Sequence, residues 1–301
     1  MVYTLTCNPA IDYVVQLNAP LTSGTINRSS GEVYQFGGKG INVSNVLREL
    51  DQPTVAMGFA AGFTGRVLEE NLREMGLITD FIYLPVGKTR INVKVKADRE
   101  TEINGAGPVI DEEAMIALNE RLDELREKDV LVLSGSVPIG MGPDAYERML
   151  RRLQGKKVRT VVDASGALLM NTLSCKPFLI KPNREELEAI VGHALTEDAQ
   201  IVDAAQQLQE MGAQNVLVSL AGDGAMLLDE KGCVHRMPCP QGQVRNSVGA
   251  GDSMVAGFLT GFLQSGNYEY ALKLGIAAGS ATAFSLELAS KEEIDSLLAA
   301  M

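Results

Sequence analysis

The sequence predicts an α/β protein: a three-layer α/β/α sandwich with a largely parallel central sheet and a small β-sheet lid. The first observation is a series of short apolar runs in the second half of the chain, each next to a helical pattern. Buried strands that alternate with helices form right-handed βαβ units and parallel sheets. The second observation is polar–apolar alternation in the first third, which is typical of strands with one exposed face. A single domain, 1–301, is therefore expected, with the lid strands inserted in the α/β body.

In chain order, the first predicted element is a strand at residues 1–6. This start lacks the basic region and long apolar run of a secretion signal. The lid strands follow where polar and apolar side chains alternate as in an antiparallel sheet, at about 12–17, 26–36, 89–96 and 101–104. These segments are not contiguous, so the lid is assembled from separate parts of the chain.

The body is predicted from four continuous apolar runs. The expected buried strands lie at residues 130–133, 158–162, 178–180 and 216–218. Helical patterns lie between or beside them, at about 143–153, near 166, at 183–191 and at 201–211. From residue 251 the chain is helical nearly to its end. A ligand is expected where the lid faces the carboxyl ends of the parallel strands.

The charge balance argues against two classes of partner. Lys and Arg number 27 and Asp and Glu number 38, which gives a formal net charge of −11. A chain this acidic repels nucleic-acid backbones and anionic membranes unless its basic residues are gathered in one place. No apolar stretch approaches the roughly 18 residues that a membrane span needs. We therefore expect no nucleic-acid partner and no membrane partner.

The cysteines indicate a reducing environment. The four cysteines are Cys7, Cys175, Cys233 and Cys239, and no two of them form a Cys-x-x-Cys pair. So few cysteines in a chain long enough to bury a large core do not indicate disulfides, and a cytoplasmic location fits. Cys233, His235 and Cys239 are not interpreted as a metal site, because their setting is typical of a hairpin.

The first candidate site segment is Gly-Gly-Lys-Gly-Ile-Asn-Val at residues 37–43, which opens a helix. Its glycines leave main-chain amides free to approach a ligand, and a helix N-terminus favours anions. Lys39 adds a positive charge there, and Asn42 can bind hydroxyl groups. The alternative is a tight turn with a solvated lysine. The segment is not a P-loop, because the first glycine of that motif is missing.

The second candidate segment is Asn-Ser-Val-Gly-Ala-Gly-Asp-Ser at residues 246–253, which runs into an apolar helix. Small residues at Gly249, Ala250 and Gly251 expose consecutive amides at a helix N-terminus, which can bind an anion. Asp252 beside them is suitably placed to take a proton from an attacking hydroxyl. The alternative is that Asp252 only caps the helix. Gly257 and Gly261 are expected to allow close helix packing.

Two further segments follow apolar strands in the second half. Asn183 and Glu186 are three residues apart on one helix face, and such oxygen ligands suit Mg²⁺. A helix cap explains the same residues equally well. The turn at 219–224 is rich in glycine and either borders a nucleotide or is a plain tight turn.

The predicted lid carries basic residues that suit a phosphate. Arg90 lies on a lid strand and Arg28 follows a separate lid segment. An inward arginine needs an anionic partner, and a phosphate fits its planar fork. Lys88 and Lys94, on the same stretch as Arg90, are expected to be solvated.

Taken together, the chain resembles the pfkB family of carbohydrate kinases, which has the ribokinase-like fold. Residues 37–43 match the family's N-terminal signature and residues 248–252 its C-terminal one. Two signatures in the correct order are far more specific than either alone. Finer matches at 6–12, 27–28, 89–94, 101–105 and 246–253 resemble the hexose-phosphate kinases within the family. Asn246 departs from the aspartate that many members carry, so a monovalent-cation site nearby is not inferred.

The resemblance implies a role for each matching residue. Asp252 resembles the base that deprotonates the acceptor hydroxyl, and Gly249, Ala250 and Gly251 resemble the anion hole for the transferring phosphoryl group. The positions that match sugar-phosphate contacts are Asp12, Arg28, Gly38, Lys39, Asn42, Arg90 and Ser136. The positions that match the nucleotide side are Lys181, Ser219, Gly222 and Gly224. Asn183 and Glu186 match an Asn-x-x-Glu motif associated with Mg²⁺.

The implied reaction is transfer of a phosphoryl group from ATP, with Mg²⁺, to a sugar phosphate. Fructose 1-phosphate is the favoured acceptor and tagatose 6-phosphate the alternative, because the runs at 91–94 and 102–105 look closer to the kinases of the former. A catalytically silent sugar-phosphate-binding protein on the same fold is the other alternative. Lid strands in this family often pair between subunits, so a homodimer through the lid is expected.

Overall fold

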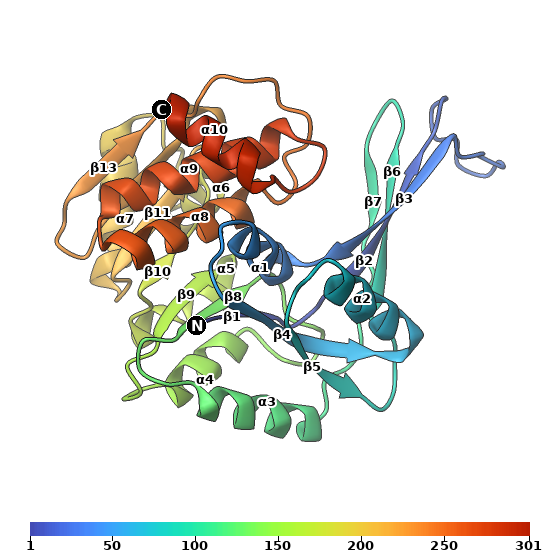
Figure 1. Cartoon of the computed structure of the whole chain (residues 1–301), viewed down its shortest axis with the longest axis horizontal. Helices are drawn as coiled ribbons and strands as arrows, with labels where there is room; N and C mark the ends of the chain where they lie inside the picture. The colour runs from blue at the N-terminus through green and yellow to red at the C-terminus, as the bar shows by residue number, and fades with distance from the viewer.

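The computed structural model describes all 301 residues and contains two separate sheets (Figure 1). The main sheet has nine strands in the order β13-β12-β11-β10-β9-β8-β1-β4-β5. Its strands are β1 (Val2–Thr6), β4 (Thr54–Ala61), β5 (Thr79–Leu84), β8 (Val130–Ser134), β9 (Arg159–Asp163), β10 (Leu179–Ile180), β11 (Asn215–Ser219), β12 (Ala225–Leu228) and β13 (Val234–Met237). Strand β12 pairs antiparallel with both β11 and β13 at one edge of the sheet, and all other neighbours pair in parallel. The predicted parallel sheet is confirmed.

Helices cover both faces of the main sheet. One face carries α3 (Glu112–Glu124), α4 (Ala145–Arg152), α5 (Gly166–Met170), α6 (Arg184–Val191) and α7 (Asp198–Glu210). The other face carries α1 (Lys39–Glu49), α8 (Ala250–Ser265), α9 (Tyr268–Phe284) and α10 (Lys291–Ala300). Helix α2 (Gly62–Glu74) packs beside α1 on β4 and β5. The result is the predicted three-layer α/β/α sandwich.

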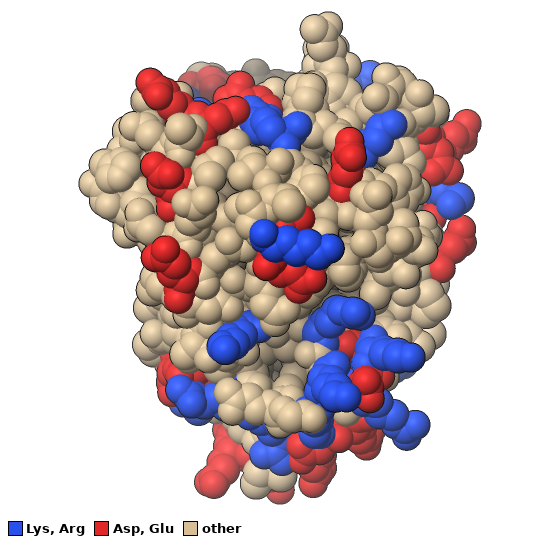
Figure 2. Space-filling model, turned by 90° about the vertical axis from the view of Figure 1, so that its left-hand side faces the viewer, with Lys and Arg blue, Asp and Glu red and all other residues tan.

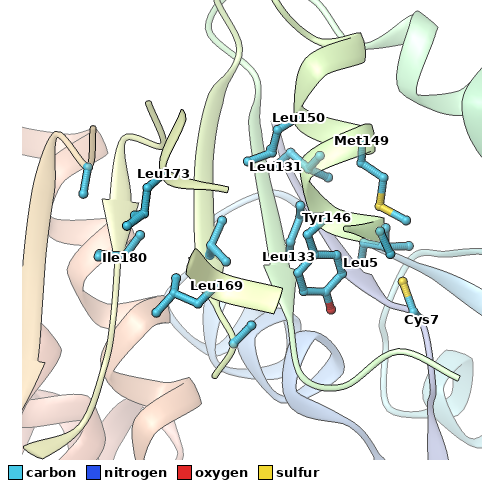
Figure 3. Packing of buried hydrophobic residues seen from close by; sticks show 14 of the residues in the cluster. Leu5, Cys7, Leu131, Leu133, Tyr146, Met149, Leu150, Leu169, Leu173 and Ile180 are labelled. Atoms are coloured by element: carbon cyan, nitrogen blue, oxygen red, sulfur yellow. The ribbon is translucent and has the colours of Figure 1, made fainter. Parts of the chain in front are cut away.

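Alternation along the buried strands builds the two layers of core. In β8, Leu131 and Leu133 pack into the core under α3 and α4, whereas Val130 and Val132 face α1 and α8. Figure 3 shows the first core, where Leu133 and the ring of Tyr146 lie beside Leu5 and Cys7 of the N-terminal strand region. Because both faces of each strand are buried, the strands have continuous apolar sequences.

Helices α8 and α9 pack closely because glycines line their contact. A Cβ atom added at Gly257 would lie 2.5 Å from the carbonyl oxygen of Leu274, and one at Gly261 would lie 2.8 Å from the Cα atom of Ala271. The prediction that these two glycines serve helix packing is confirmed.

We therefore expect Gly257→Ala to lower the free energy of unfolding by about 1–3 kcal/mol, the usual cost of overpacking a core. Urea titration measures this change. Gly222→Ala is the control, since a Cβ atom there would have no neighbour within 4 Å. An unchanged stability of Gly257→Ala would show that the two helices can separate without cost.

The lid is a four-stranded sheet that projects from the body on the right of Figure 1. Its order is β3-β2-β6-β7, with β2 (Ala10–Gln16), β3 (Gly31–Gly37), β6 (Arg90–Lys96) and β7 (Thr101–Ile103). Two details of the prediction are wrong. The central strands β2 and β6 pair in parallel, so the lid is mixed rather than antiparallel. The strand expected from residue 26 begins at Gly31, because the stretch before it is exposed and includes the 84% exposed Ile26.

The remaining boundaries differ by a few residues for local reasons. Helix α4 begins at Ala145, after the proline at 143, and α6 begins after its cap, Asn183. Helix α7 begins at Asp198, three residues earlier than predicted, because Glu197 and Gln200 form a capping box. The elements β4, α2, β5 and α3 were not predicted at all.

Charged side chains of both signs are mixed on the surface. Figure 2 shows one face, on which the Lys and Arg side chains gather in the lower part with Asp and Glu side chains among them. This face has no continuous basic strip of the kind that nucleic-acid backbones attract. None of the helices combines the length and apolar character that crossing a bilayer demands.

Candidate active site

Polar residues lie at the carboxyl ends of five neighbouring parallel strands. They are Asn8 after β1, Ser136 after β8, Asp163 at the end of β9, Lys181 and Asn183 after β10, and Ser219 at the end of β11. Two adjacent cavities, of about 510 and 430 Å³, lie above these ends. The cavities share Gly38, Lys39 and Arg90, so they form one continuous site between the lid and the sheet. This is the position that the sequence predicted for a ligand.

The N-terminus of α8 presents free amides to the smaller cavity. Gly249 is the N-cap residue with φ +82°, a conformation that glycine adopts without strain. The amide of Ala250 donates to the carbonyl of Ser247, at 3.3 Å. The amides of Gly249, Gly251 and Asp252 have no backbone acceptor. An anion at this helix end would therefore be held by these amides rather than by that of Ala250.

Asp252 lies in the first turn of α8 and lines the same cavity, with only 5% of its surface exposed. Its Oδ2 accepts a hydrogen bond of 2.8 Å from Nδ2 of Asn42, on α1. No side chain caps α8, so the alternative role of Asp252 as a plain helix cap is wrong. Two signatures that are about 200 residues apart in sequence thus meet at this carboxylate.

The surroundings of Asp252 make it a weaker acid than an ordinary aspartate. Burial raises the pKa of Asp252 to about 7, and the negative charge of Asp163 adds to the rise. The hydrogen bond from Asn42 and the charges of Lys39 and Lys181 oppose this rise. A carboxylate with a pKa near neutrality is a competent proton acceptor at physiological pH.

Asp163 connects the two lysines of the site. Its Oδ1 lies 3.3 Å from Nζ of Lys181 and 3.5 Å from Nζ of Lys39. Asp163 is 1% exposed, and its Oδ2 has no hydrogen-bond partner. Burial alone would lower the pKa of Lys39, but the charges of Asp163, Asp252 and Glu186 raise it. Both lysines are thus held at the cavity wall.

The raised pKa of Asp252 predicts a pH dependence. If Asp252 must be ionised to act, kcat/KM falls as the pH drops below about 7 and is level above it, because kcat/KM follows the free enzyme. Initial rates between pH 5.5 and 9 measure this. Asp163→Asn removes a neighbouring negative charge and should move the acidic limb to lower pH. A limb that does not move would contradict its assignment to Asp252, and a limb near pH 6 in both proteins would assign it to the second ionisation of the substrate phosphate.

On the lid side, Asp12 is held by two partners. Its Oδ1 accepts from Nδ2 of Asn92 at 2.7 Å, and its Oδ2 lies 2.9 Å from Nζ of Lys94. Lys88 is exposed as predicted. The prediction of a solvated Lys94 is wrong, because the ion pair with Asp12 draws this lysine out of water.

Arg90 reaches both cavities from the start of β6. Its Nε donates to the carbonyl of Asn8 at 3.1 Å, and its Nη1 donates to that of Gly105 at 3.4 Å. Burial lowers the pKa of Arg90, against the pull of Asp12. Its Nη2 is left without an acceptor. Ser136 is exposed at the wall of the larger cavity.

Arg28 is not brought to the site. It lies in the exposed connection 17–30 between β2 and β3 and lines neither cavity.

Only some of the residues predicted on the nucleotide side lie together in the structure. Lys181, Asn183 and Ser219 line the smaller cavity, whereas Gly222 and Gly224 lie outside both cavities. Asn183 and Glu186 form a capping box on α6, in which each side chain accepts from the other's backbone amide, at 2.7 and 2.9 Å. The helix-cap alternative for this pair is therefore confirmed. Oε1 of Glu186 has no hydrogen bond.

Sequence reasoning missed Asp163 and Asn92 and misplaced Lys94. Asp163 had a usable signal, since it directly follows the buried run at 158–162. The other two had none, because only the register of β2 on β6 places Asn92 opposite Asp12.

Comparison with known proteins agrees with this geometry. The family model described as pfkB family carbohydrate kinase matches residues 1–294. A protein of Bacillus subtilis named 1-phosphofructokinase is 45% identical over 99% of this chain and 97% of its own. A protein of Bacillus licheniformis named D-tagatose-1-phosphate kinase is 35% identical over 98% of this chain and 96% of its own.

Among solved structures, phosphofructokinase-2 from Escherichia coli in complex with fructose 6-phosphate superposes with a TM-score of 0.91. It is 29% identical, and the match covers 99% of this chain and 98% of that one. Another structure of that enzyme is described as its tetrameric inhibited form. These likenesses confirm the ribokinase-like fold class.

Proposed function

We propose that this chain, which belongs to the pfkB family of carbohydrate kinases, is a 1-phosphofructokinase. The reaction transfers the terminal phosphoryl group of ATP to the 6-hydroxyl of fructose 1-phosphate and yields fructose 1,6-bisphosphate and ADP. The observation that carries the proposal is the buried carboxylate of Asp252 beside free amides, in a cavity that runs from the lid to the nucleotide-side strands. The 45% identity to the Bacillus subtilis enzyme supports the choice of acceptor.

The chemistry follows from the first turn of α8. Asp252 accepts the proton of the acceptor hydroxyl as its oxygen bonds to the terminal phosphorus of ATP. The bond from that phosphorus to the bridging oxygen breaks, and ADP leaves. The amides of Gly249 and Gly251 stabilise the charge on the transferring group, with Ala250 shaping the turn that exposes them. Positioning and charge neutralisation are the main demands of phosphoryl transfer, and this site supplies both.

The substrate phosphate is assigned to the larger cavity. Arg90 offers an Nη2 without an acceptor there, and Lys39 and Ser136 line the same cavity. The sugar then extends past Gly38 and Asn42 toward Asp252, and Asp12 binds sugar hydroxyls from the lid. Arg28 stays a proposed phosphate contact only for a state in which its exposed connection folds over the site.

ATP is assigned to the side of β10 and β11. Lys181 and Ser219 line the cavity there, and Gly222 and Gly224 form the turn that borders the nucleotide. Mg²⁺ binds proteins through one or two carboxylates, phosphates and waters. Glu186, with its free Oε1, and the unpartnered Oδ2 of Asp163 suit such a cation, with Asn183 holding Glu186 in place. Bound Mg²⁺ would neutralise charge on the phosphates of ATP.

A second acceptor has specific support. The Bacillus licheniformis relative is named for tagatose 1-phosphate, which differs from fructose 1-phosphate in the configuration of one hydroxyl. Tagatose 6-phosphate, the alternative favoured by the sequence motifs, is tested beside it.

The deciding experiment is a coupled assay of ADP release with four acceptors: fructose 1-phosphate, tagatose 1-phosphate, tagatose 6-phosphate and fructose 6-phosphate. We expect the highest kcat/KM with fructose 1-phosphate and loss of activity when EDTA removes Mg²⁺. A preference for either tagatose phosphate would replace the proposed acceptor. No acceptor-dependent ADP release with any of the four would favour a binding protein instead.

We further propose a homodimer through the lid in the cytoplasm. The lid sheet exposes Val33, Tyr34, Ile91 and Ile103, and β3 and β7 are open edges that can pair with another chain. Sedimentation of the purified chain tests the dimer.

A further inference from the structure

Two lid segments that the sequence analysis singled out converge on one carboxylate. Residues 91–94 lie on β6 and residues 102–105 lie on and after β7. Asn92 binds Oδ1 of Asp12 with its amide nitrogen, and its Oδ1 accepts from the amide of Gly105 at 3.1 Å. Lys94 lies 2.9 Å from Oδ2 of Asp12 and 3.9 Å from Oε1 of Glu102. Both runs thus fix the orientation of Asp12.

Lys94 is the unusual member of this group. Its side chain is only 11% exposed, although a lysine is almost never buried without a partner. It lines neither of the two cavities, whereas Asp12 and Asn92 both line the smaller one. Lys94 therefore contacts the Asp12 carboxylate without itself forming part of the cavity wall. The contact that connects Lys94 to the cavity lining is its ion pair with Asp12.

The hydrogen-bonding capacity of Asp12 shows what remains for a ligand. An ionised carboxylate has about four lone-pair sites on its two oxygens. Asn92 and Lys94 each occupy one oxygen from the lid side. The remaining acceptor sites can take hydroxyl donors, in an orientation that the lid fixes before the sugar arrives.

We propose that Lys94 is a positioning residue that holds the Asp12 carboxylate in the orientation that binds the hydroxyls of the sugar phosphate. The proposal rests on the proposed function, since it takes a sugar phosphate as the ligand of this cavity. Lys94 also offsets the negative charge of Asp12 in a site that must admit an anionic substrate.

The test is steady-state kinetics of Lys94→Met, which keeps an unbranched apolar stem. We expect KM for the sugar phosphate to rise on the order of 10- to 100-fold, the loss of one hydrogen bond to a charged group. We expect kcat and KM for ATP to stay within about twofold of the wild-type values. The lost interaction binds the sugar phosphate equally in the ground state and the transition state, so its loss changes KM for that substrate and not kcat. Lys94→Arg should recover most of the affinity, and Lys96→Met, an exposed lysine two residues along the same strand, should have no effect.

A double variant separates positioning from direct contact. If Lys94 acts through Asp12, then Asp12→Asn combined with Lys94→Met should be no worse than Asp12→Asn alone. Additive losses in KM would overturn the proposal and place Lys94 on the substrate itself. An equal rise in KM for ATP would overturn it as well, by showing general damage to the lid.

The proposed function is tested separately by the wild-type chain in the acceptor panel. If another hexose phosphate proves to be the substrate, the same ratios between variants are measured with that acceptor, and they still decide the role of Lys94.

Discussion

Asp252→Asn is expected to lower kcat on the order of 10²- to 10⁴-fold, the usual contribution of a positioned base. The change keeps the size and burial of the side chain but removes its ability to take a proton. Binding of ATP, measured by calorimetry, should be nearly unchanged, because the amides of Gly249 and Gly251 do not depend on this carboxylate. Asp98→Asn, in an exposed lid turn, is the matched control and should retain full activity.

The same variant has an expected effect on stability. The pKa of Asp252 is about 7 in the folded protein and near 3.8 for an unperturbed aspartate. Between these values the folded state binds more protons, so wild-type stability falls as the pH rises from about 4 to 7. Asparagine does not ionise, so the variant should gain stability relative to wild type above pH 7. Thermal unfolding of both proteins at pH 5 and pH 8 measures this difference in stability. For the kinetic prediction, a kcat loss of less than tenfold in Asp252→Asn would contradict the role of Asp252 as base.

Arg90→Ala is expected to raise KM for the sugar phosphate on the order of 10²-fold, the cost of losing a charge-assisted, forked contact to phosphate. KM for ATP should change little, because the residues assigned to ATP follow β10 and β11, whereas Arg90 is assigned to the substrate phosphate. The comparison of the two KM values is the measurement. Arg90→Lys keeps the charge without the planar fork. Its KM for the sugar phosphate should therefore lie between those of the wild type and Arg90→Ala.

Arg90 also holds the carbonyls of Asn8 and Gly105, so its removal can loosen the lid. Thermal unfolding of Arg90→Ala distinguishes this from loss of a ligand contact. An equal rise in both KM values would show that Arg90 is not the phosphate contact.

The body could be predicted from the sequence because each buried strand has apolar residues on both faces. The runs at 130–133, 158–162 and 216–218 coincide with β8, β9 and β11. The elements β4, α2, β5 and α3 were missed, although Thr54–Ala61 is an equally apolar run. In the first third of the chain, the polar–apolar alternation of the lid segments is the stronger local pattern. The parallel pairing of β2 with β6 leaves no trace in either strand's own sequence.

Within the site, residues that occur in dense motifs were found and isolated partners were not. Asn42 and Asp252 lie in glycine-rich segments, and their hydrogen bond follows from the helix N-termini that both segments form. Asp163 and Lys94 stand alone in their strands. Asp163 can be noticed from its place directly after the buried run at 158–162, but Lys94 has no such signal. The partners of both residues are brought near only by the fold, so local sequence could not reveal what they contact.

The path of the N-terminal segment ties lid and body into one cooperative unit. Strand β1 lies between β4 and β8 in the main sheet, and only three residues later the chain enters β2, which lies between β3 and β6 in the lid. A protease that nicks the exposed connection 17–30 would therefore release nothing: the short first fragment would remain interleaved in both sheets. For the same reason the lid cannot be deleted, or transferred to another protein, as one continuous segment of the chain.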